Sequence, residues 1–160
     1  MEAYSDDDYA LISPVNFPDV KGHEPIDRLA ERKLEVCVIF TDMLGTLEAL
    51  CAAEKFGEQL AVRIRLLVPY EVPYVLPLAE PPVPVELLET QIRNLAGRTH
   101  LEVDAQIYLC RDRRVALSLL LPPHSVAIIG GRKNWWPSPA QRLARDLERD
   151  GHHVIFAELR

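Results

Sequence analysis

Short apolar runs alternate with segments of helical periodicity along most of this chain. Residues 35–41 are an almost continuous β-branched and apolar run, which is typical of a strand covered on both faces. Residues 44–57 then have helical periodicity, and Gly57 is a stop signal for that helix. One face of the predicted helix carries four apolar residues: Leu47, Leu50, Cys51 and Ala53.

The same alternation continues to residue 158. Further strands are predicted over residues 61–68, 100–109, 125–129 and 153–158, and further helices over residues 85–97, 112–121 and 138–150. Asp112 and Ser138 are natural N-caps for the last two helices. Six prolines fall within residues 69–84, so this segment is predicted to be a loop and neither a helix nor a central strand.

Five strands that alternate with four helices predict an α/β fold with a parallel sheet and helices on both faces. The expected architecture is a three-layer α/β/α sandwich of the flavodoxin-like or Rossmann-like type, with strand order 3-2-1-4-5. The third strand, residues 100–109, alternates between apolar and polar residues and is expected nearer an edge of the sheet. Residues 34–160 therefore form one predicted domain.

The acidic charge is concentrated before that domain. Residues 1–33 contain eight acids and four bases, a balance of -4, whereas residues 34–160 contain sixteen acids and fourteen bases, a balance of -2. Residues 1–24 are aperiodic and broken by prolines, so we predict a tail that is loose or laid on the surface, followed by a possible short helix over residues 25–33. The nearly neutral domain offers no basic field for nucleic acid.

The three cysteines, Cys37, Cys51 and Cys110, lie in apolar segments without motif spacing, which predicts buried free thiols and neither a disulfide framework nor a zinc site. The first ten residues have no basic and apolar stretch of the kind found in a secretory signal. No apolar run approaches the ~20 residues that cross a bilayer. A cytoplasmic protein without a membrane partner is the expectation.

The first strand ends in the sequence IFTD, at Ile39 to Asp42, and runs directly into a helix. The fourth strand ends in AIIGGR, at Ala127 to Arg132, and a helix and a short strand close the domain. In these strand ends and in the order of its elements, the chain resembles the universal stress protein family over residues 34–160. The resemblance implies the flavodoxin-like fold and an adenine nucleotide alpha hydrolase-like cleft.

The resemblance also implies candidate ligand contacts at the ends of the first, second and fourth strands. In the family the aspartate after the first strand contacts the adenosine part of ATP, and Asp42, beside Thr41, has this position. The main chain that contacts adenine corresponds to Leu67 and Val68. ATP-binding members carry G-x2-G-x9-G-[S/T] after the fourth strand. The resemblance assigns ligand binding there to Gly130, Gly131, Arg132, Lys133 and Ser138.

That motif is degenerate in this chain. Gly130 matches its first glycine, but Lys133 and Leu143 stand at the second and third, and no G-S or G-T pair follows. A phosphate cradle needs backbone N–H groups with no Cβ in the way, and a lysine in a left-handed conformation costs about 1–2 kcal/mol. The chain therefore resembles the family members that do not bind ATP in the usual manner, and no cofactor is required.

Two features near the predicted cleft allow more than one interpretation. Asp42 is either a ribose-hydroxyl acceptor or a cap for the following helix through N–H groups around Gly45. Basic residues at the same edge either attract an anionic ligand, helped by the helix start at Ser138, or are solvated loop charges. These basic residues are Arg111, Arg113, Arg114, Arg132 and Lys133.

Aromatic residues in two loops are likewise open to interpretation. Trp135 and Trp136 either stack on a ligand or, as we favour, pack against the domain's own helices or a partner subunit. Tyr70 and Tyr74 either line the cleft mouth or pack on the surface.

The sequence contains no recognisable catalytic constellation. His124, His152 and His153 fall at the edge opposite the cleft, and no serine or cysteine has a histidine and an acid in motif spacing. A non-enzymatic binding or regulatory module is the first interpretation. A nucleotide-binding protein or weak ATPase is the alternative, and a response-regulator receiver is disfavoured because the third strand ends without an aspartate.

Family members commonly dimerise through the last strand. Here that strand contains the apolar run Val154, Ile155, Phe156 and Ala157. An exposed apolar edge strand needs covering, so a homodimer is expected.

Overall fold

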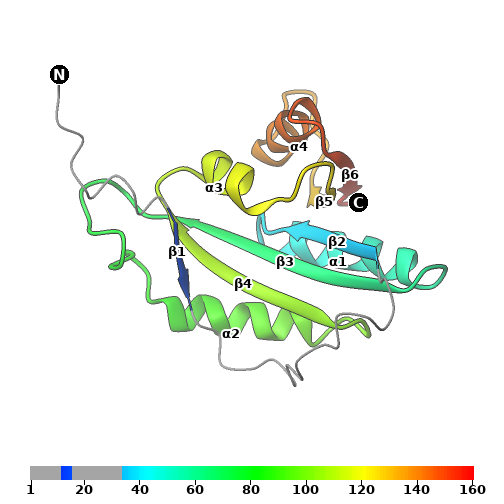
Figure 1. Cartoon of the computed structure of the whole chain (residues 1–160), viewed down its shortest axis with the longest axis horizontal. Coiled ribbons are helices and arrows are strands. Elements are labelled where there is room, and N and C mark those ends of the chain that lie inside the picture. The colour runs from blue at the N-terminus through cyan, green and yellow to red at the C-terminus, as the bar shows by residue number, and fades with distance from the viewer. Residues whose placement is uncertain (1–11, 16–33) are drawn as a thin grey trace.

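The computed structural model describes residues 12–15 and 34–160. They form a three-layer α/β/α sandwich whose sheet has the order β1-β4-β3-β2-β5-β6 (Figure 1). The strands are β1 (Ile12–Val15), β2 (Leu34–Ile39), β3 (Val62–Glu71), β4 (Val103–Cys110), β5 (Val126–Gly131) and β6 (His153–Glu158). The helices are α1 (Met43–Gly57), α2 (Val85–Ala96), α3 (Arg113–Leu120) and α4 (Pro139–Arg149).

The five strands β4-β3-β2-β5-β6 are all parallel. Numbered along the predicted domain, their order is 3-2-1-4-5, so the predicted flavodoxin-like architecture is confirmed. The chain leaves the central strand β2 toward β3 and later returns to its other side at β5. The carboxyl ends of β2 and β5 are therefore the topological switch point, where ligands bind in open sheets of this kind.

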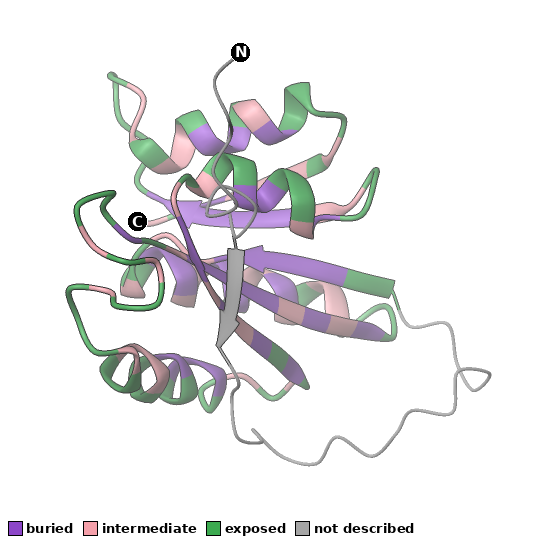
Figure 2. Ribbon diagram, turned by 60° about the vertical axis from the view of Figure 1, so that its left-hand side comes forward, coloured by how far each residue is buried: buried purple, intermediate pink, exposed green. Residues whose placement is uncertain are grey.

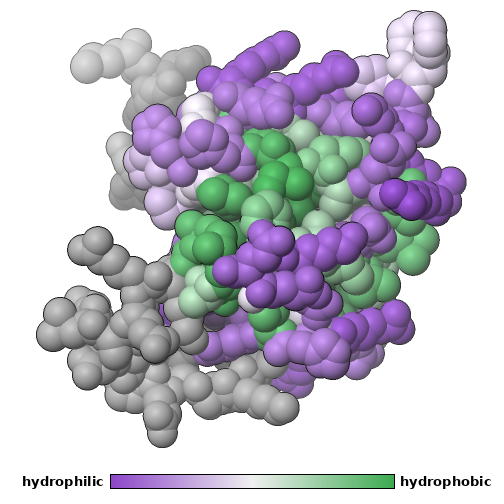
Figure 3. All heavy atoms as spheres, turned by 90° about the vertical axis from the view of Figure 1, so that its right-hand side faces the viewer, coloured by the Kyte–Doolittle hydropathy of each residue, from purple (hydrophilic) through white to green (hydrophobic). Residues whose placement is uncertain are grey.

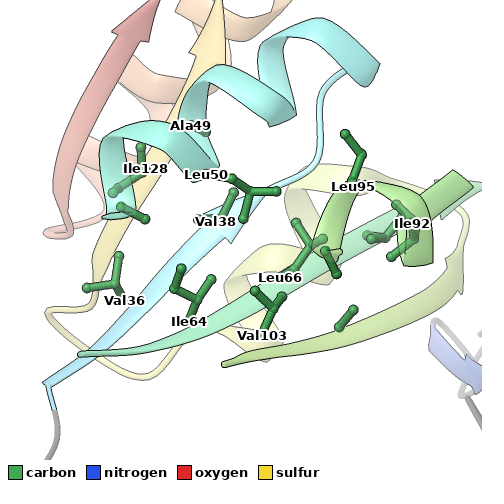
Figure 4. Close-up of a cluster of buried hydrophobic side chains, with 14 of the residues drawn as sticks. Val36, Val38, Ala49, Leu50, Ile64, Leu66, Ile92, Leu95, Val103 and Ile128 are labelled. Atoms are coloured by element: carbon green, nitrogen blue, oxygen red, sulfur yellow. The ribbon is translucent and has the colours of Figure 1, made fainter. Parts of the chain in front are cut away.

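Alternate side chains of the strands enter two separate cores. Val36 and Val38 of β2 face α1 and α2, together with apolar residues of β3, β4 and β5 (Figure 4). Cys37 and Ile39, one residue out of phase, face α3 and α4. Both faces of the central strands are consequently buried, which explains their continuous apolar sequences (Figure 2).

A sixth strand was not predicted. The prediction for residues 1–24 was an aperiodic tail, yet Ile12–Val15 pairs antiparallel with β4, with Ile12 opposite Cys110 and Val15 opposite Ile107. Four residues that include Pro14 carry too little periodicity to indicate a strand, and pairing with β4 stabilises it. The predicted helix over residues 25–33 lies outside the described residues.

The prediction for the proline-rich segment was wrong at its beginning, because β3 continues through Pro69 to Glu71. β2 pairs with β3 only as far as Leu67, whereas β4 pairs with β3 as far as Glu71. The Leu67 carbonyl accepts from the Phe40 N–H at 2.9 Å, so the Pro69 nitrogen, two residues later, faces the same side beyond the end of β2. A proline there removes no ladder hydrogen bond.

Among the described residues, none of the helices combines the length and the apolar character that crossing a bilayer requires.

The prediction of three buried cysteines is correct for Cys37 and Cys110 and wrong for Cys51, which is exposed on α1. Leu50 and Ala53 of the predicted face of α1 are buried beside Ala49, and Leu47 is partly buried against the same core, so Cys51 is the one member of that face that is exposed. The burial of the other two thiols raises the pKa of Cys37 to about 11 and the pKa of Cys110 to about 11.

We expect brief alkylation of the native protein at mildly alkaline pH to modify Cys51 alone. Thiolates are the reactive species, and a pKa of about 11 keeps Cys37 and Cys110 protonated there, in addition to their burial. Intact-protein mass spectrometry would show one adduct before unfolding in urea and three afterwards. Native modification of Cys37 or Cys110 as fast as Cys51 would contradict the described core.

Candidate functional site

A cleft of about 450 Å³ opens at the switch point, between the carboxyl ends of β2 and β5. A volume of this size falls within the range of small-molecule sites. The starts of three helices, α1, α3 and α4, contribute to its walls. It is lined by Thr41, Asp42, Leu44, Arg113, Gly131, Arg132, Asn134, Ser138, Pro139, Ala140 and Leu159.

A contact between two glycine backbones holds the floor of this cleft together. A Cβ built on Gly130 would lie 1.7 Å from the Gly45 carbonyl oxygen, and one built on Gly45 would lie 2.5 Å from the Gly130 carbonyl oxygen. The Thr41 hydroxyl donates to the Gly130 carbonyl at 2.8 Å, and the Thr41 N–H donates to the Thr46 hydroxyl at 3.2 Å. The first turn of α1 is thereby fixed directly against β5.

Asp42 caps α1. Its Oδ1 accepts a hydrogen bond of 2.7 Å from the Gly45 N–H, and its backbone has the extended conformation of an N-cap residue. The cap interpretation of Asp42 is therefore confirmed, and its use as a ribose acceptor stays a prediction. The carboxylate remains exposed and lines the cleft.

Two backbone amides of the loop from β5 to α4, those of Asn134 and Ser138, donate to a side chain of the protein. The Gln141 side-chain oxygen accepts from the Ser138 N–H at 2.9 Å and from the Asn134 N–H at 3.2 Å. The Ser138 hydroxyl accepts from the Gln141 N–H at 3.2 Å and donates to the Arg132 carbonyl at 3.1 Å. Ser138 is thus the predicted N-cap, and amides that could face an anion are satisfied by a capping box.

Backbone N–H groups at the start of α3 also donate to side chains of the protein. Asp112 accepts from the Arg114 N–H at 2.8 Å and from the Val115 N–H at 3.1 Å, and Glu71 of β3 accepts from the Arg113 N–H at 2.9 Å. All three helix starts at the cleft therefore carry side-chain caps supplied by the protein.

The positive charge that enters the cleft comes from Arg113 and Arg132. The Nε of Arg113 is buried and has no hydrogen-bond partner within the described residues. Arg132 is exposed and follows the end of β5. Together with Asp42 these side chains give the cleft two cations and one anion.

Of the nine predicted site residues, the cleft brings together five: Thr41, Asp42, Gly131, Arg132 and Ser138. Leu67 and Val68 are buried in the two cores and do not line it. Gly130 lies against Gly45 behind the lining residues. Lys133 lines a separate depression of about 270 Å³ beside α4 and β6.

Two of the basic residues that were predicted at the cleft contact other parts of the protein instead. The Arg111 Nη1 donates to the carbonyls of Val72, Pro73 and Leu76 at 3.1, 2.8 and 2.9 Å, so Arg111 fixes the proline-rich loop. Arg114 lies 4.0 Å from the Asp150 carboxylate. Neither arginine lines the cleft.

The packing prediction for the two tryptophans is wrong as far as the chain's own described residues are concerned. Trp135 is 94% exposed and Trp136 is 82% exposed. They follow Asn134 on the rim without lining the cleft, so stacking on a ligand or contact with a partner stays open. Tyr74 is also exposed, with the Arg111 guanidinium 5.2 Å from its ring centroid, and Tyr70 packs against the first core.

Sequence reasoning did not select the remaining cleft residues as site residues. Leu44 and Ala140 lie in the first turns of helices, where a contribution follows only once the helix directions are known. Leu159 reaches the cleft because its N–H donates to the Gly131 carbonyl at 2.9 Å, which extends β6 past its last residue. Asn134 had no motif around it that indicated a role.

The histidines at the amino edge of the sheet, opposite the cleft, make structural hydrogen bonds. His124 and His152 bond across the β5 and β6 starts, to the Gly151 carbonyl and the Ser125 N–H respectively, each at 3.2 Å. Residues 12–15 and 34–160 contain no cluster of three side chains suited to a metal ion.

No protein-family model matches the chain, and the searches of curated proteins and of solved structures found no match either. The resemblance to universal stress proteins therefore stays a prediction from the residues quoted above.

Substitution of Gly130 by alanine is expected to destabilise the fold by at least about 3 kcal/mol, because its Cβ would collide with the α1 backbone. The measurement is the urea midpoint of unfolding. Gly97→Ala is the matched control, since a Cβ there meets only the Arg93 and Asn94 carbonyl oxygens, at 3.3 and 3.7 Å, and the backbone is already helical. Equal midpoints for the two variants would contradict the described contact.

Proposed function

We propose that this chain is a non-enzymatic binding or regulatory module, similar to universal stress proteins with a degenerate ATP motif. The observation that carries the proposal is the internal satisfaction of the amides around the cleft. N–H groups at Gly45, Asn134 and Ser138 already donate to protein side chains. A triphosphate that used them would have to displace well-formed caps, each worth about 1 kcal/mol.

The position of Gly130 supports the same proposal. In the family motif this glycine belongs to a phosphate-binding loop, whereas here its lack of a Cβ serves the contact with Gly45. The cleft retains room and two arginines for a smaller or less highly charged ligand.

The alternative, a nucleotide-binding protein or weak ATPase, is favoured by one observation. Asp42, Gly131 and Arg132 line the same cleft at the switch point, where a nucleotide would bind in this type of sheet. Gly130 and Lys133, which this alternative also invoked, do not line it. The two functions differ in whether a nucleotide binds at all.

Calorimetric titration with magnesium and ATP distinguishes them. We expect no saturable heat up to the order of 1 mM ATP, which corresponds to binding weaker than about -4.1 kcal/mol. Two variants separate the roles of Asp42: Asp42→Ser keeps a cap for Gly45 but removes the carboxylate, and Asp42→Ala removes both. Submicromolar binding in the native protein that is lost in both variants would establish the alternative.

We also propose that the module forms a homodimer through β6. β6 pairs only with β5 within the described part of the chain, and Val154, Ile155 and Phe156 on it are half-buried. Apolar side chains gather on the side of the molecule that carries β6 in Figure 1, with polar side chains around them (Figure 3). An unpaired strand edge of this kind is a template for pairing with a second copy.

The direction of the β6 amides gives a specific test. The His153 N–H donates to the Ser125 carbonyl and the Leu159 N–H to the Gly131 carbonyl, so odd-numbered residues face β5 and even-numbered residues face outward. Val154→Pro therefore removes an outward N–H and leaves the β5 ladder intact. Light scattering should give twice the monomer mass of 18.1 kDa for the native chain and the monomer mass for Val154→Pro.

Val154→Ala is the control for that substitution, because it removes side-chain atoms and keeps the outward N–H. We expect it to remain a dimer. A native chain that is monomeric at micromolar concentration would overturn the dimer proposal.

A further inference from the structure

One flank of α4 lies along the outer edge of β6. Helical spacing puts Asp150, which lies 4.0 Å from Arg114 of α3, on the opposite flank, so this one faces away from α3. Between it and β6 is the depression of about 270 Å³. The depression is lined by Lys133, Gln141, Ala144, Arg145, Glu148, Phe156 and Glu158.

Two exposed residues of opposite charge, Arg145 and Glu148, stand three residues apart on this flank. In an interface between two copies related by a two-fold axis, each contact occurs twice with the roles of the copies exchanged. Two antiparallel copies of α4 can therefore form two identical ion pairs, each between Arg145 of one copy and Glu148 of the other. A flank that is complementary in charge to itself indicates a second copy of the chain as its partner.

The outward amides of β6 restrict how a second β6 can pair with it. Even-numbered residues carry the outward N–H groups, so in an antiparallel pair they lie opposite even-numbered residues of the other copy. When Ile155 lies opposite its own copy, Val154 lies opposite Phe156 and the facing residues are apolar. A shift by one residue either way sets Phe156 opposite His152 or Val154 opposite Glu158. Apolar cross-strand pairs favour the Ile155 register.

The position of α4 along β6 agrees with this register. Gly131 pairs with Glu158, and a Cβ built on Gly131 would lie 2.8 Å from the Ala140 Cβ, so Ala140 stands near the level of Glu158. The midpoint between the two charged residues of the flank lies six to seven residues farther along α4, or about 10 Å. Three residues of strand cover about the same distance. The midpoint is therefore near the level of Ile155.

The spacing of the strands brings the two helices into contact range. α4 packs on both β5 and β6, because Leu143, Ala144 and Leu147 share a core with residues of both strands. If two β6 strands pair, two helices centred between β5 and β6 lie two strand spacings apart, or about 10 Å. Packed helices are separated by about 8–10 Å.

We propose that two copies of the chain pair β6 with β6 in the Ile155 register, and that their α4 helices meet above these strands through reciprocal Arg145–Glu148 ion pairs. The inference rests on the proposed homodimer and deepens it, since it adds the register and a second contact surface. The depression beside α4 is then enclosed between the two copies.

Charge reversal with rescue tests this on the full-length chain. Arg145→Glu and Glu148→Arg each place like charges opposite each other twice, so each should raise the dissociation constant of the dimer by about 10-fold or more. The double variant Arg145→Glu/Glu148→Arg restores opposite charges and should dimerise like the native chain. Sedimentation velocity over a concentration series measures all four proteins.

Arg149→Glu is the matched control. It makes the same change of charge on α4, at a residue that does not line the depression. We expect it to dimerise like the native chain, so a loss there equal to that of Arg145→Glu would indicate a general charge effect and overturn the inference. Recovery in the double variant also shows that the substitutions leave the fold intact.

Other results would also overturn the inference. Native dimerisation in both single variants would show that α4 is outside the interface, and a double variant as weak as the single ones would show that the two residues do not pair. If the native chain is a dimer and Val154→Pro is a monomer while the charge variants change nothing, this inference fails and the β6 dimer stands. A monomeric native chain overturns both.

Discussion

The contact between the backbones of Gly45 and Gly130 is the constraint on which the rest of the site depends. It brings the first turn of α1 against the end of β5 more closely than any side chain would allow. The Thr41 hydroxyl also donates a hydrogen bond to the Gly130 carbonyl, so the ends of β2 and β5 are fixed relative to each other.

The same packing gives Gly130 a structural role, which supports our proposal that this cleft is not a phosphate-binding site of the usual kind. The caps at Asp42, Asp112 and Ser138 then satisfy the helix starts around the cleft. The side chains that the cleft offers to a ligand include two arginines and one carboxylate.

The sequence predicted the parallel core and the location of the cleft because both follow from strong local signals. Continuous apolar runs indicated the central strands, and Asp112 and Ser138 indicated two helix starts to the residue. The topology then placed Thr41 and Arg132 at one edge. These inferences needed only periodicity, capping and the handedness of crossovers.

Other features depend on distances between elements of the fold, which the periodicity of the sequence does not reveal. The four residues of β1 are stabilised by pairing with β4, and Pro69 fits in β3 only because β2 is shorter than β4 on that side. Arg111 resembled a rim base in sequence, yet three loop carbonyls hold it. Cys51 was grouped with the buried Leu50 and Ala53 of α1 but lies at the exposed margin of that face, and Trp135 is exposed beside the cleft.

The central claim is that four amides beside the cleft already donate to side chains of the protein itself. It is tested most directly by following the amide signals of Gly45, Asn134, Ser138 and Gln141 in NMR spectra while magnesium and ATP are added. The account predicts that these amides are protected from hydrogen exchange in the free protein and that their shifts do not change with ATP. Saturable shifts of the four amides, with phosphate replacing the side-chain acceptors, would contradict it.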